Sequence, residues 1–117
     1  MSKTAGALLF KFVMTLLIAL LTLSLFDSNP WPIITLFALV AAAANYLVGD
    51  LVVLPAAGNI TASIGDGVMA GLIAYIMDLA SLGFRTTLGT LVALGLFIAL
   101  GEYLFHQYLE NTPKVAP

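Results

Sequence analysis

The sequence predicts an all-α integral membrane protein in which four antiparallel transmembrane helices form an up-down-up-down bundle. Of its 117 residues, 62% are hydrophobic and only 9% are charged, whereas ordinary soluble domains have about 25% charged residues. The apolar residues fall into four segments of about twenty residues each, the length that crosses a hydrocarbon core. Short polar connections separate these segments and make successive helices antiparallel neighbours. We therefore expect a single transmembrane domain over residues 1–117.

The first two helices are expected over residues 5–26 and 31–54. Lys11 interrupts the first apolar segment, and a polar segment that ends in Pro30 closes it. The second segment includes a glycine and an aspartate near its end. It continues past them because Pro55 is the first residue that cannot extend an α-helix there.

The last two helices are expected over residues 60–82 and 87–108, followed by a polar tail over residues 109–117. In the turn before the third helix, Gly58 suits a left-handed backbone conformation. Asn59 follows it and can cap the third helix through its side chain.

The orientation in the membrane depends on few basic residues. Lys3, Lys11 and Lys114 lie on one side of the predicted bundle, and Arg85 lies on the other. The positive-inside rule then predicts a multi-pass plasma-membrane protein with both termini in the cytoplasm. In an alternative with three spans, residues 50–66 form a re-entrant loop instead of a hairpin.

Several polar residues are expected to lie at similar depth in the cytoplasmic half of the bilayer. With a helical rise of about 1.5 Å per residue, Asp50 lies about 6 Å before Pro55, and Asp66 lies about 10 Å beyond Asn59. Because these two helices are antiparallel, both carboxylates fall in the same leaflet. The predicted polar or ion cluster consists of Lys11, Asn45, Asp50, Asp66, Glu102 and His106.

The charges of this cluster do not balance, since three acids accompany one certain cation. An ionisable group in hydrocarbon needs a partner, a wet cavity or a neutral state. Either one carboxyl is protonated, or His106 is charged, or a cation or water completes the set. Other placements remain open, because Lys11 can snorkel to the interface, Asp50 can be solvated and Glu102 can lie among headgroups. A metal site formed by Asp66, Glu102 and His106 is chemically feasible, but the spacing of these residues is not diagnostic.

Asp78 lies in the opposite leaflet, inside the apolar part of the third helix. Arg85 follows seven residues later on the same face, so the two residues form a predicted outer-leaflet polar pair. A second proton or ion station at Asp78 is the alternative.

Small residues at four-residue spacing predict close helix packing. Gly67 and Gly71 have this spacing in the third helix, and Gly95 and Ala99 have it in the fourth. Membrane helices associate through such residues because lipid offers no hydrophobic driving force between them. The contacts join helices of one chain, or alternatively they form the face of a homo-oligomer.

Several function classes are excluded or disfavoured by the composition. The absence of cysteine excludes disulfides, thiolate metal sites and cysteine nucleophiles. Four basic residues cannot form a nucleic-acid-binding surface, and no catalytic or phosphate-binding motif occurs. We therefore expect no enzyme and no cofactor. The expected partners are the lipid bilayer, a proton or small cation and, as an open alternative, further copies of the chain.

Three stretches carry a resemblance to a known family. They are KFVMTLL at 11–17, YLVGDLVVLPAAGNITASIGD at 46–66 and GEYLFHQYL at 101–109. They resemble the YndM-like family, small multi-span membrane proteins of spore-forming and related Gram-positive bacteria, of unknown function. The resemblance implies a bacterial plasma-membrane protein and supplies no activity, substrate or catalytic residue.

Two hypotheses about function follow. The first is a small proton- or cation-conducting channel or transporter-like protein that uses the buried carboxylates. The second is a non-transporting scaffold or partner subunit whose buried polar residues fix the helix packing. Unbalanced buried acids are costly in a pure scaffold, which favours transport.

Overall fold

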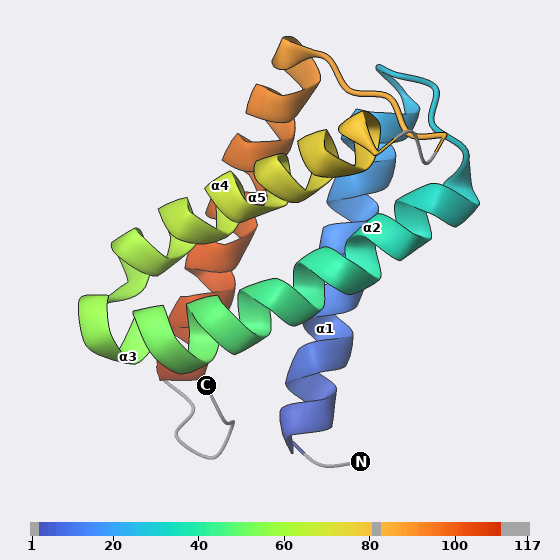
Figure 1. The fold of residues 1–117 in the computed structure, drawn as a ribbon. Coiled ribbons are helices and arrows are strands. Elements are labelled where there is room, and N and C mark those ends of the chain that lie inside the picture. The colour runs from blue at the N-terminus through green and yellow to red at the C-terminus, as the bar shows by residue number, and fades with distance from the viewer. Residues whose placement is uncertain (1–2, 81–82, 111–117) are drawn as a thin grey trace.

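The computed structural model of the chain describes residues 3–80 and 83–110, and all of its elements are helical (Figure 1). Two π-helical segments, η1 and η2, continue the helices that precede them. In chain order, the elements are α1 (Lys3–Ala19), η1 (Leu20–Ser24), α2 (Trp31–Ala44), η2 (Asn45–Val53), α3 (Leu54–Ala57), α4 (Asn59–Leu79) and α5 (Leu88–Glu110).

Four continuous helices of the described chain are long and apolar enough to cross a membrane. They extend over Thr4–Ser24, Trp31–Ala57, Asn59–Leu79 and Leu88–Tyr108. Their outward surfaces expose large apolar side chains along their length, among them Leu21, Leu39, Ile64 and Leu96. Faces of this kind are typical of helices that contact lipid.

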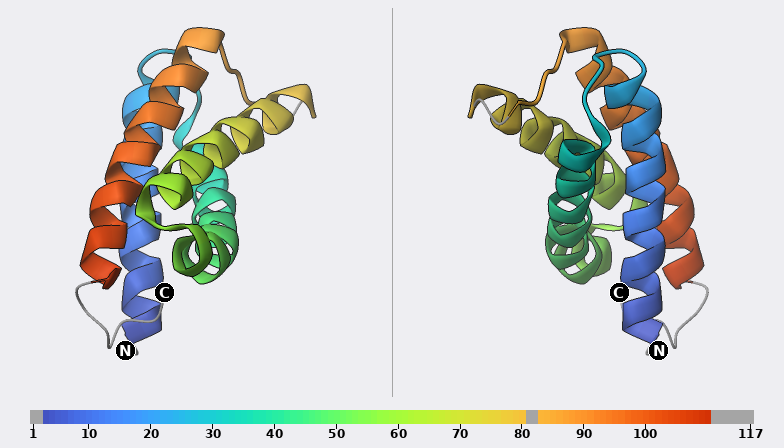
Figure 2. Two further views of the ribbon diagram at one scale, coloured as in Figure 1. Left: turned by 90° about the vertical axis from the view of Figure 1, so that its left-hand side faces the viewer. Right: turned by 90° about the vertical axis from the view of Figure 1, so that its right-hand side faces the viewer.

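Successive long helices run in opposite directions, but their axes are not all aligned with one another. α1 and α5 lie side by side, and α1 begins at the end of the molecule where α5 ends (Figures 1 and 2). α2 and α4 lie steeply inclined across them (Figure 2). The crossing of α4 over α5 is close because Gly67 meets the carbonyl of Gly95, where a Cβ would overlap it. Small residues at such a contact permit the inclined packing of membrane helices.

The second long helix passes through Pro55 and ends at Ala57, so the expected end at residue 54 is wrong. Pro55 lies in the first turn of α3, directly after the π-helical η2. Because Pro55 has no amide N–H to donate, it interrupts the helical hydrogen bonds, and the helix extends only two residues beyond it. Gly58 then has a φ of 87°, as expected for the turn, and α4 begins at Asn59. Residues 50–66 thus form a hairpin and no re-entrant loop.

The other boundaries differ from the expected ones by a few residues. The first long helix ends at Ser24, the third ends at Leu79, and α5 extends to Glu110. The two residues at the start of the predicted tail are therefore helical. Residues 111–117 of that tail, and residues 81–82 at the expected end of the third helix, lie outside the described residues.

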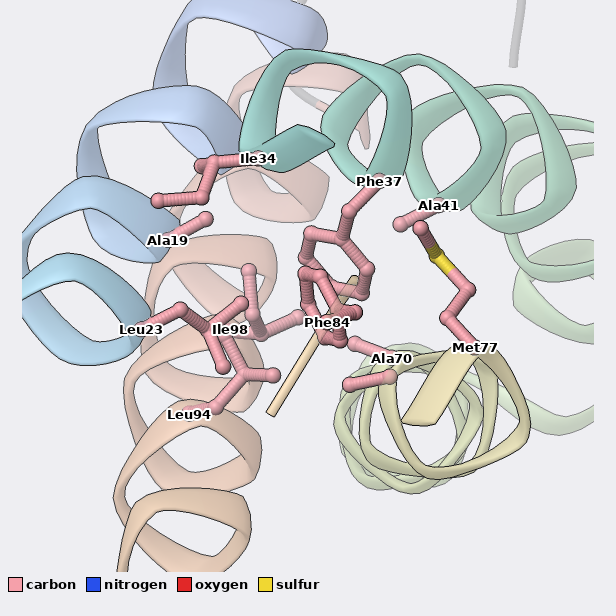
Figure 3. Packing of buried hydrophobic residues seen from close by; sticks show 11 residues of the cluster. Ala19, Leu23, Ile34, Phe37, Ala41, Ala70, Met77, Phe84, Leu94 and Ile98 are labelled. Atoms are coloured by element: carbon pink, nitrogen blue, oxygen red, sulfur yellow. The ribbon is translucent and has the colours of Figure 1, made fainter. Parts of the chain in front are cut away.

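The larger apolar cluster fills the half of the molecule near the first and third connections (Figure 3). Phe37 and Phe84 stack within it, with ring centroids 6.0 Å apart. Alanines on three helices let the backbones approach one another around these rings. The buried residues of this apolar core are Ala19, Leu23, Ile34, Phe37, Ala41, Ala70, Ala74, Met77, Phe84, Leu94 and Ile98.

A smaller apolar cluster lies toward the opposite end of the molecule. Its buried members are Ala7, Leu54, Ala62 and Phe105. Along the first three long helices, these residues and those of the apolar core lie on opposite sides of the buried charged residue, whereas on α5 Phe105 lies between Glu102 and His106. The charged residues are therefore enclosed between two apolar regions.

Candidate functional site

Five ionisable side chains from all four long helices meet in the interior. Each is at most 1% exposed. We call this group the ionic layer: Lys11 of α1, Asp50 of η2, Asp66 of α4, and Glu102 and His106 of α5. The antiparallel order of the helices predicted this gathering, and the structure brings all five together.

The ammonium group of Lys11 lies among the three carboxylates of the layer. Its Nζ donates a hydrogen bond to Asp50 Oδ1 over 3.2 Å and another to Glu102 Oε2. It also lies 3.9 Å from Asp66 Oδ2 and 5.0 Å from the centre of the Phe105 ring. Since the side chain is fully buried, Lys11 does not snorkel to the interface. Its positive charge instead stabilises three buried negative groups.

His106 connects the carboxylates to polar groups near the start of α4. Its Nε2 lies 2.8 Å from Asp50 Oδ1 and 3.2 Å from Asp66 Oδ2. Its Nδ1 lies 2.9 Å from Asn59 Oδ1 and 3.1 Å from Ser63 Oγ. Both ring nitrogens therefore face oxygen atoms.

The hydrogen bonds around Nδ1 fix the proton on that nitrogen. Asn59 Nδ2 donates to the carbonyl of Tyr103, so Asn59 Oδ1 is the atom turned toward His106. Ser63 Oγ also donates to Asn59 Oδ1, over 2.9 Å. An amide oxygen can only accept, so Nδ1 must carry a hydrogen and donate it. A second proton then lies between Nε2 and the carboxylates of Asp50 and Asp66.

The formal charges of the layer do not balance. If all three carboxylates are ionised, Lys11 and a protonated His106 supply two positive charges against three negative ones. Three carboxylate oxygens of the layer accept no hydrogen bond from the described residues, although two of them lie within ion-pair distance of Lys11 or His106. They are Asp50 Oδ2, Asp66 Oδ2 and Glu102 Oε1. The ionised layer thus has unused capacity for one more positive charge.

The π-helical form of η2 determines which of its residues face the layer. Residues five apart share a face when hydrogen bonds join residue i to residue i+5, whereas an α-helix would rotate them about 140° apart. Asn45 and Asp50 have this spacing, and both are fully buried. Gly49, also on this face, leaves room for Asp66, because a Cβ on Gly49 would overlap the Asp66 carboxylate.

Asn45 is the predicted cluster member that the structure does not join to the layer. It is 0% exposed, and neither Oδ1 nor Nδ2 has a hydrogen-bond partner among the described residues. The hydroxyl of Thr15, one turn beyond Lys11 on α1, is also buried without a partner. Both residues lie on the side of the layer toward the apolar core.

Three residues of the site were missed from the sequence: Gly49, Asn59 and Ser63. Asn59 was expected to cap α4, but its side chain makes no capping hydrogen bond and binds His106, Ser63 and Tyr103 instead. The four-residue spacing of Asn59 and Ser63 was the available signal, since it places both side chains on one face of a helix.

The predicted polar pair of Asp78 and Arg85 forms no direct ion pair in the described part of the chain. Asp78 Oδ2 accepts hydrogen bonds from the backbone N–H and the hydroxyl of Thr86, at 3.1 and 2.7 Å. The backbone of Arg85 is held by Asn29, which accepts from its N–H and donates to its carbonyl, while its side chain is exposed. Thr86 donates both hydrogen bonds to the carboxylate. Fixing its short side chain costs less conformational entropy than fixing an arginine side chain would.

Of the four small residues predicted to pack helices, Gly67, Gly95 and Ala99 meet where α4 crosses α5, and Gly71 lies beside this crossing. A Cβ on Gly67 would lie 3.1 Å from the Cβ of Ala99 and would overlap the carbonyl of Gly95. A Cβ on Gly71 would lie 3.9 Å from the carbonyl of Leu91. These residues therefore pack helices within one chain.

The acids and the histidine have the spacing of cation ligands. One donor atom from each of Asp50, Asp66, Glu102 and His106 lies within 4.8 Å of the others. Carboxylate and imidazole groups at such distances can bind divalent metals. However, the ammonium of Lys11 already lies among these atoms, so the chain supplies its own cation there. We therefore do not assign these residues as metal ligands.

Comparison with known proteins yields one family. A family model described as "Protein of unknown function (DUF2512)" matches residues 2–115. The match includes all three stretches that carry the resemblance noted above. No curated protein and no solved structure matches the chain.

Proposed function

Because the chain belongs to the DUF2512 family, whose description assigns no function, we propose a function from the geometry of the ionic layer. The protein is a small multi-pass membrane protein that moves protons through this layer. The observation that carries the proposal is the position of His106 Nε2, which lies 2.8 Å from Asp50 Oδ1 and 3.2 Å from Asp66 Oδ2. It lies in a buried layer whose three carboxylates can bind protons.

The membrane location rests on the four long apolar helices and their exposed apolar faces. We place the protein in the plasma membrane of a bacterium, as its resemblance to the YndM-like family implies. The distribution of basic residues favours cytoplasmic termini, and α1 begins at the end of the molecule where α5 ends (Figure 1). The ionic layer then lies nearer the cytoplasmic side.

His106 is the residue through which protons reach the layer. Asn59, at the first residue of α4, is only half-buried, and Ser63 follows one turn later. Both contact Nδ1, whereas Nε2 faces the carboxylates. An imidazole that keeps a proton on Nδ1 can bind a second proton at Nε2 and release it to a carboxylate, so His106 can relay protons at Nε2.

If all three carboxylates are ionised and His106 is protonated, uptake of one proton changes the layer from a charge of −1 to neutral, and release restores the negative charge. The neutral layer is more stable in its apolar surroundings, because a net charge buried away from water raises the free energy of the folded protein. The apolar core, which includes Phe37 and Leu94, separates the layer from the Asp78 end of the molecule. The structure therefore fits an occluded state of a transporter-like protein better than an open channel.

A non-transporting scaffold is the second candidate. The observation that favours it is that the ionic layer joins all four long helices and is almost completely buried. Such a layer also fixes the positions of the helices relative to one another. In this case the substitutions that disturb it would change stability without affecting any flux.

Proton flux into liposomes separates the two candidates. With the purified chain in liposomes that contain a pH-sensitive dye, an imposed pH gradient should dissipate faster than in empty liposomes. Asp66→Asn should slow this dissipation about tenfold, because it removes a carboxylate that faces Nε2. Ser63→Ala, which removes one contact of Nδ1, should slow it less.

Asp27→Asn is the matched control, since Asp27 lies outside the layer and its carboxylate accepts a hydrogen bond from Thr87. It should transport as the wild type does. The proposal is wrong if folded wild-type protein leaves the gradient as intact as empty liposomes do. It is also wrong if folded Asp66→Asn and Ser63→Ala both retain the wild-type rate.

A further inference from the structure

A groove of about 740 Å³ lies along α4 and α5, away from the ionic layer. Exposed apolar side chains such as Ile64, Val68 and Leu72 line most of it. Its polar end is formed by Asp78, Thr86 and Thr87. We propose that this groove binds one hydrocarbon chain of a membrane lipid whose headgroup carries an amine. This inference rests on the membrane location proposed above but not on proton movement.

The groove results from the way in which α4 and α5 cross. The helices touch at Gly67 and Gly95, and they diverge toward the end of α4 and the start of α5 (Figures 1 and 2). Gly71 lies in the groove wall without a side chain, and the atom nearest to a Cβ there would be the carbonyl oxygen of Leu91, at 3.9 Å. A larger side chain at position 71 would therefore extend into the groove.

The length of the groove suits a hydrocarbon chain. Ile64 and Asp78 are fourteen positions apart on α4, which corresponds to about 21 Å. Both residues line the groove, so an extended hydrocarbon chain can lie along it.

The charge at the polar end selects the headgroup. The carboxylate of Asp78 is half-buried, and no lysine or arginine is among the residues that line the groove. Both hydrogen bonds from Thr86 reach Oδ2, which leaves the other carboxylate oxygen for a ligand. An ammonium group complements this end, whereas a headgroup with only negative charge is repelled.

Native mass spectrometry of the full chain in detergent tests the proposal. Dioleoyl phosphatidylethanolamine should remain bound at one molecule per chain, in preference to dioleoyl phosphatidylglycerol. Gly71→Leu should reduce this binding about tenfold, because the new side chain occupies the groove. Gly65→Leu is the matched control, since a Cβ there meets nothing within 4 Å and Gly65 does not line the groove.

Two results would overturn the proposal that the groove binds a hydrocarbon chain of a lipid. One is equal lipid retention by Gly71→Leu and Gly65→Leu. The other is a wild-type dimer that Gly71→Leu dissociates, since a second copy would then occupy the groove. Asp78→Asn should abolish the preference for phosphatidylethanolamine, and an unchanged preference would contradict the headgroup assignment. Because no pH gradient is used, these results do not depend on the outcome of the flux experiment.

Discussion

Lys11→Met is expected to lower the free energy of unfolding by about 3–5 kcal/mol, the cost of removing one partner from a buried ion pair. Methionine retains an unbranched apolar side chain but removes the ammonium group that contacts Asp50, Asp66 and Glu102. The remaining carboxylates would then repel one another in a region closed to water. Unfolding in mixed detergent micelles, followed by circular dichroism, measures the effect.

A second substitution shows whether charge is the cause. Glu102→Gln removes the carboxylate that accepts a hydrogen bond from Lys11. Added to Lys11→Met, it should restore part of the lost stability, because fewer negative charges remain unpaired. A Lys11→Met protein as stable as the wild type would show that Lys11 does not compensate the acids. If the double variant loses as much stability as the two single variants together, this would also show that Lys11 does not compensate the acids.

Gly49→Ala is expected to have the second largest effect, a destabilisation of about 1–3 kcal/mol through overpacking. The new Cβ would overlap the carboxylate of Asp66, a short side chain held by the ionic layer. This cost opposes the gain of about 1 kcal/mol that alanine brings over glycine in a helix. The same unfolding measurement applies, and proton flux should fall together with stability.

Gly101→Ala is the control for this prediction. A Cβ on Gly101 would lie 2.9 Å from Met14 Sδ, near the end of a flexible side chain that can move aside. It should therefore be neutral or slightly stabilising. Equal effects of Gly49→Ala and Gly101→Ala would mean that Gly49 has no special role beside Asp66.

The ionic layer could be predicted from the sequence because the depth of each residue depends only on the helical rise and on the order of the helices. Helical rise and antiparallel order alone place Asp50 and Asp66 at similar depth, and both lie in the layer. Their burial follows from the apolar residues that flank them in the sequence. The pairing of particular atoms, such as Nε2 with Asp50 Oδ1, depends on side-chain conformations that periodicity does not contain.

The departures from the predicted fold have tertiary causes. η2 is π-helical where Asp50 contacts Lys11 and His106, and no local propensity indicates such a widened turn. The same segment allows the helix to continue through Pro55, which local rules treat as a stop. The inclination of α4 to α5 likewise depends on the contact of Gly67 with Gly95, two residues distant in sequence.

Asn59 shows the limit of reading a local motif. An asparagine after a glycine at the start of a helix is a good capping residue, yet its amide is used by Tyr103 and His106 on α5. The carboxylate of Asp78 similarly binds Thr86 rather than Arg85. In both cases a neighbour in space offers better hydrogen bonds than the partner suggested by spacing.

The central claim is that the buried layer exchanges protons with the medium through His106. His106 is the single histidine of the chain, so ¹⁵N-labelled histidine in reconstituted bilayers reports on this site alone. Across the pH range in which the protein stays folded, Nδ1 should remain protonated while the Nε2 signal changes with bulk pH. Asp50→Asn should shift the Nε2 signal, and Asp27→Asn should not. An Nδ1 without a proton, or a His106 spectrum that does not change with pH in the folded protein, would contradict the account.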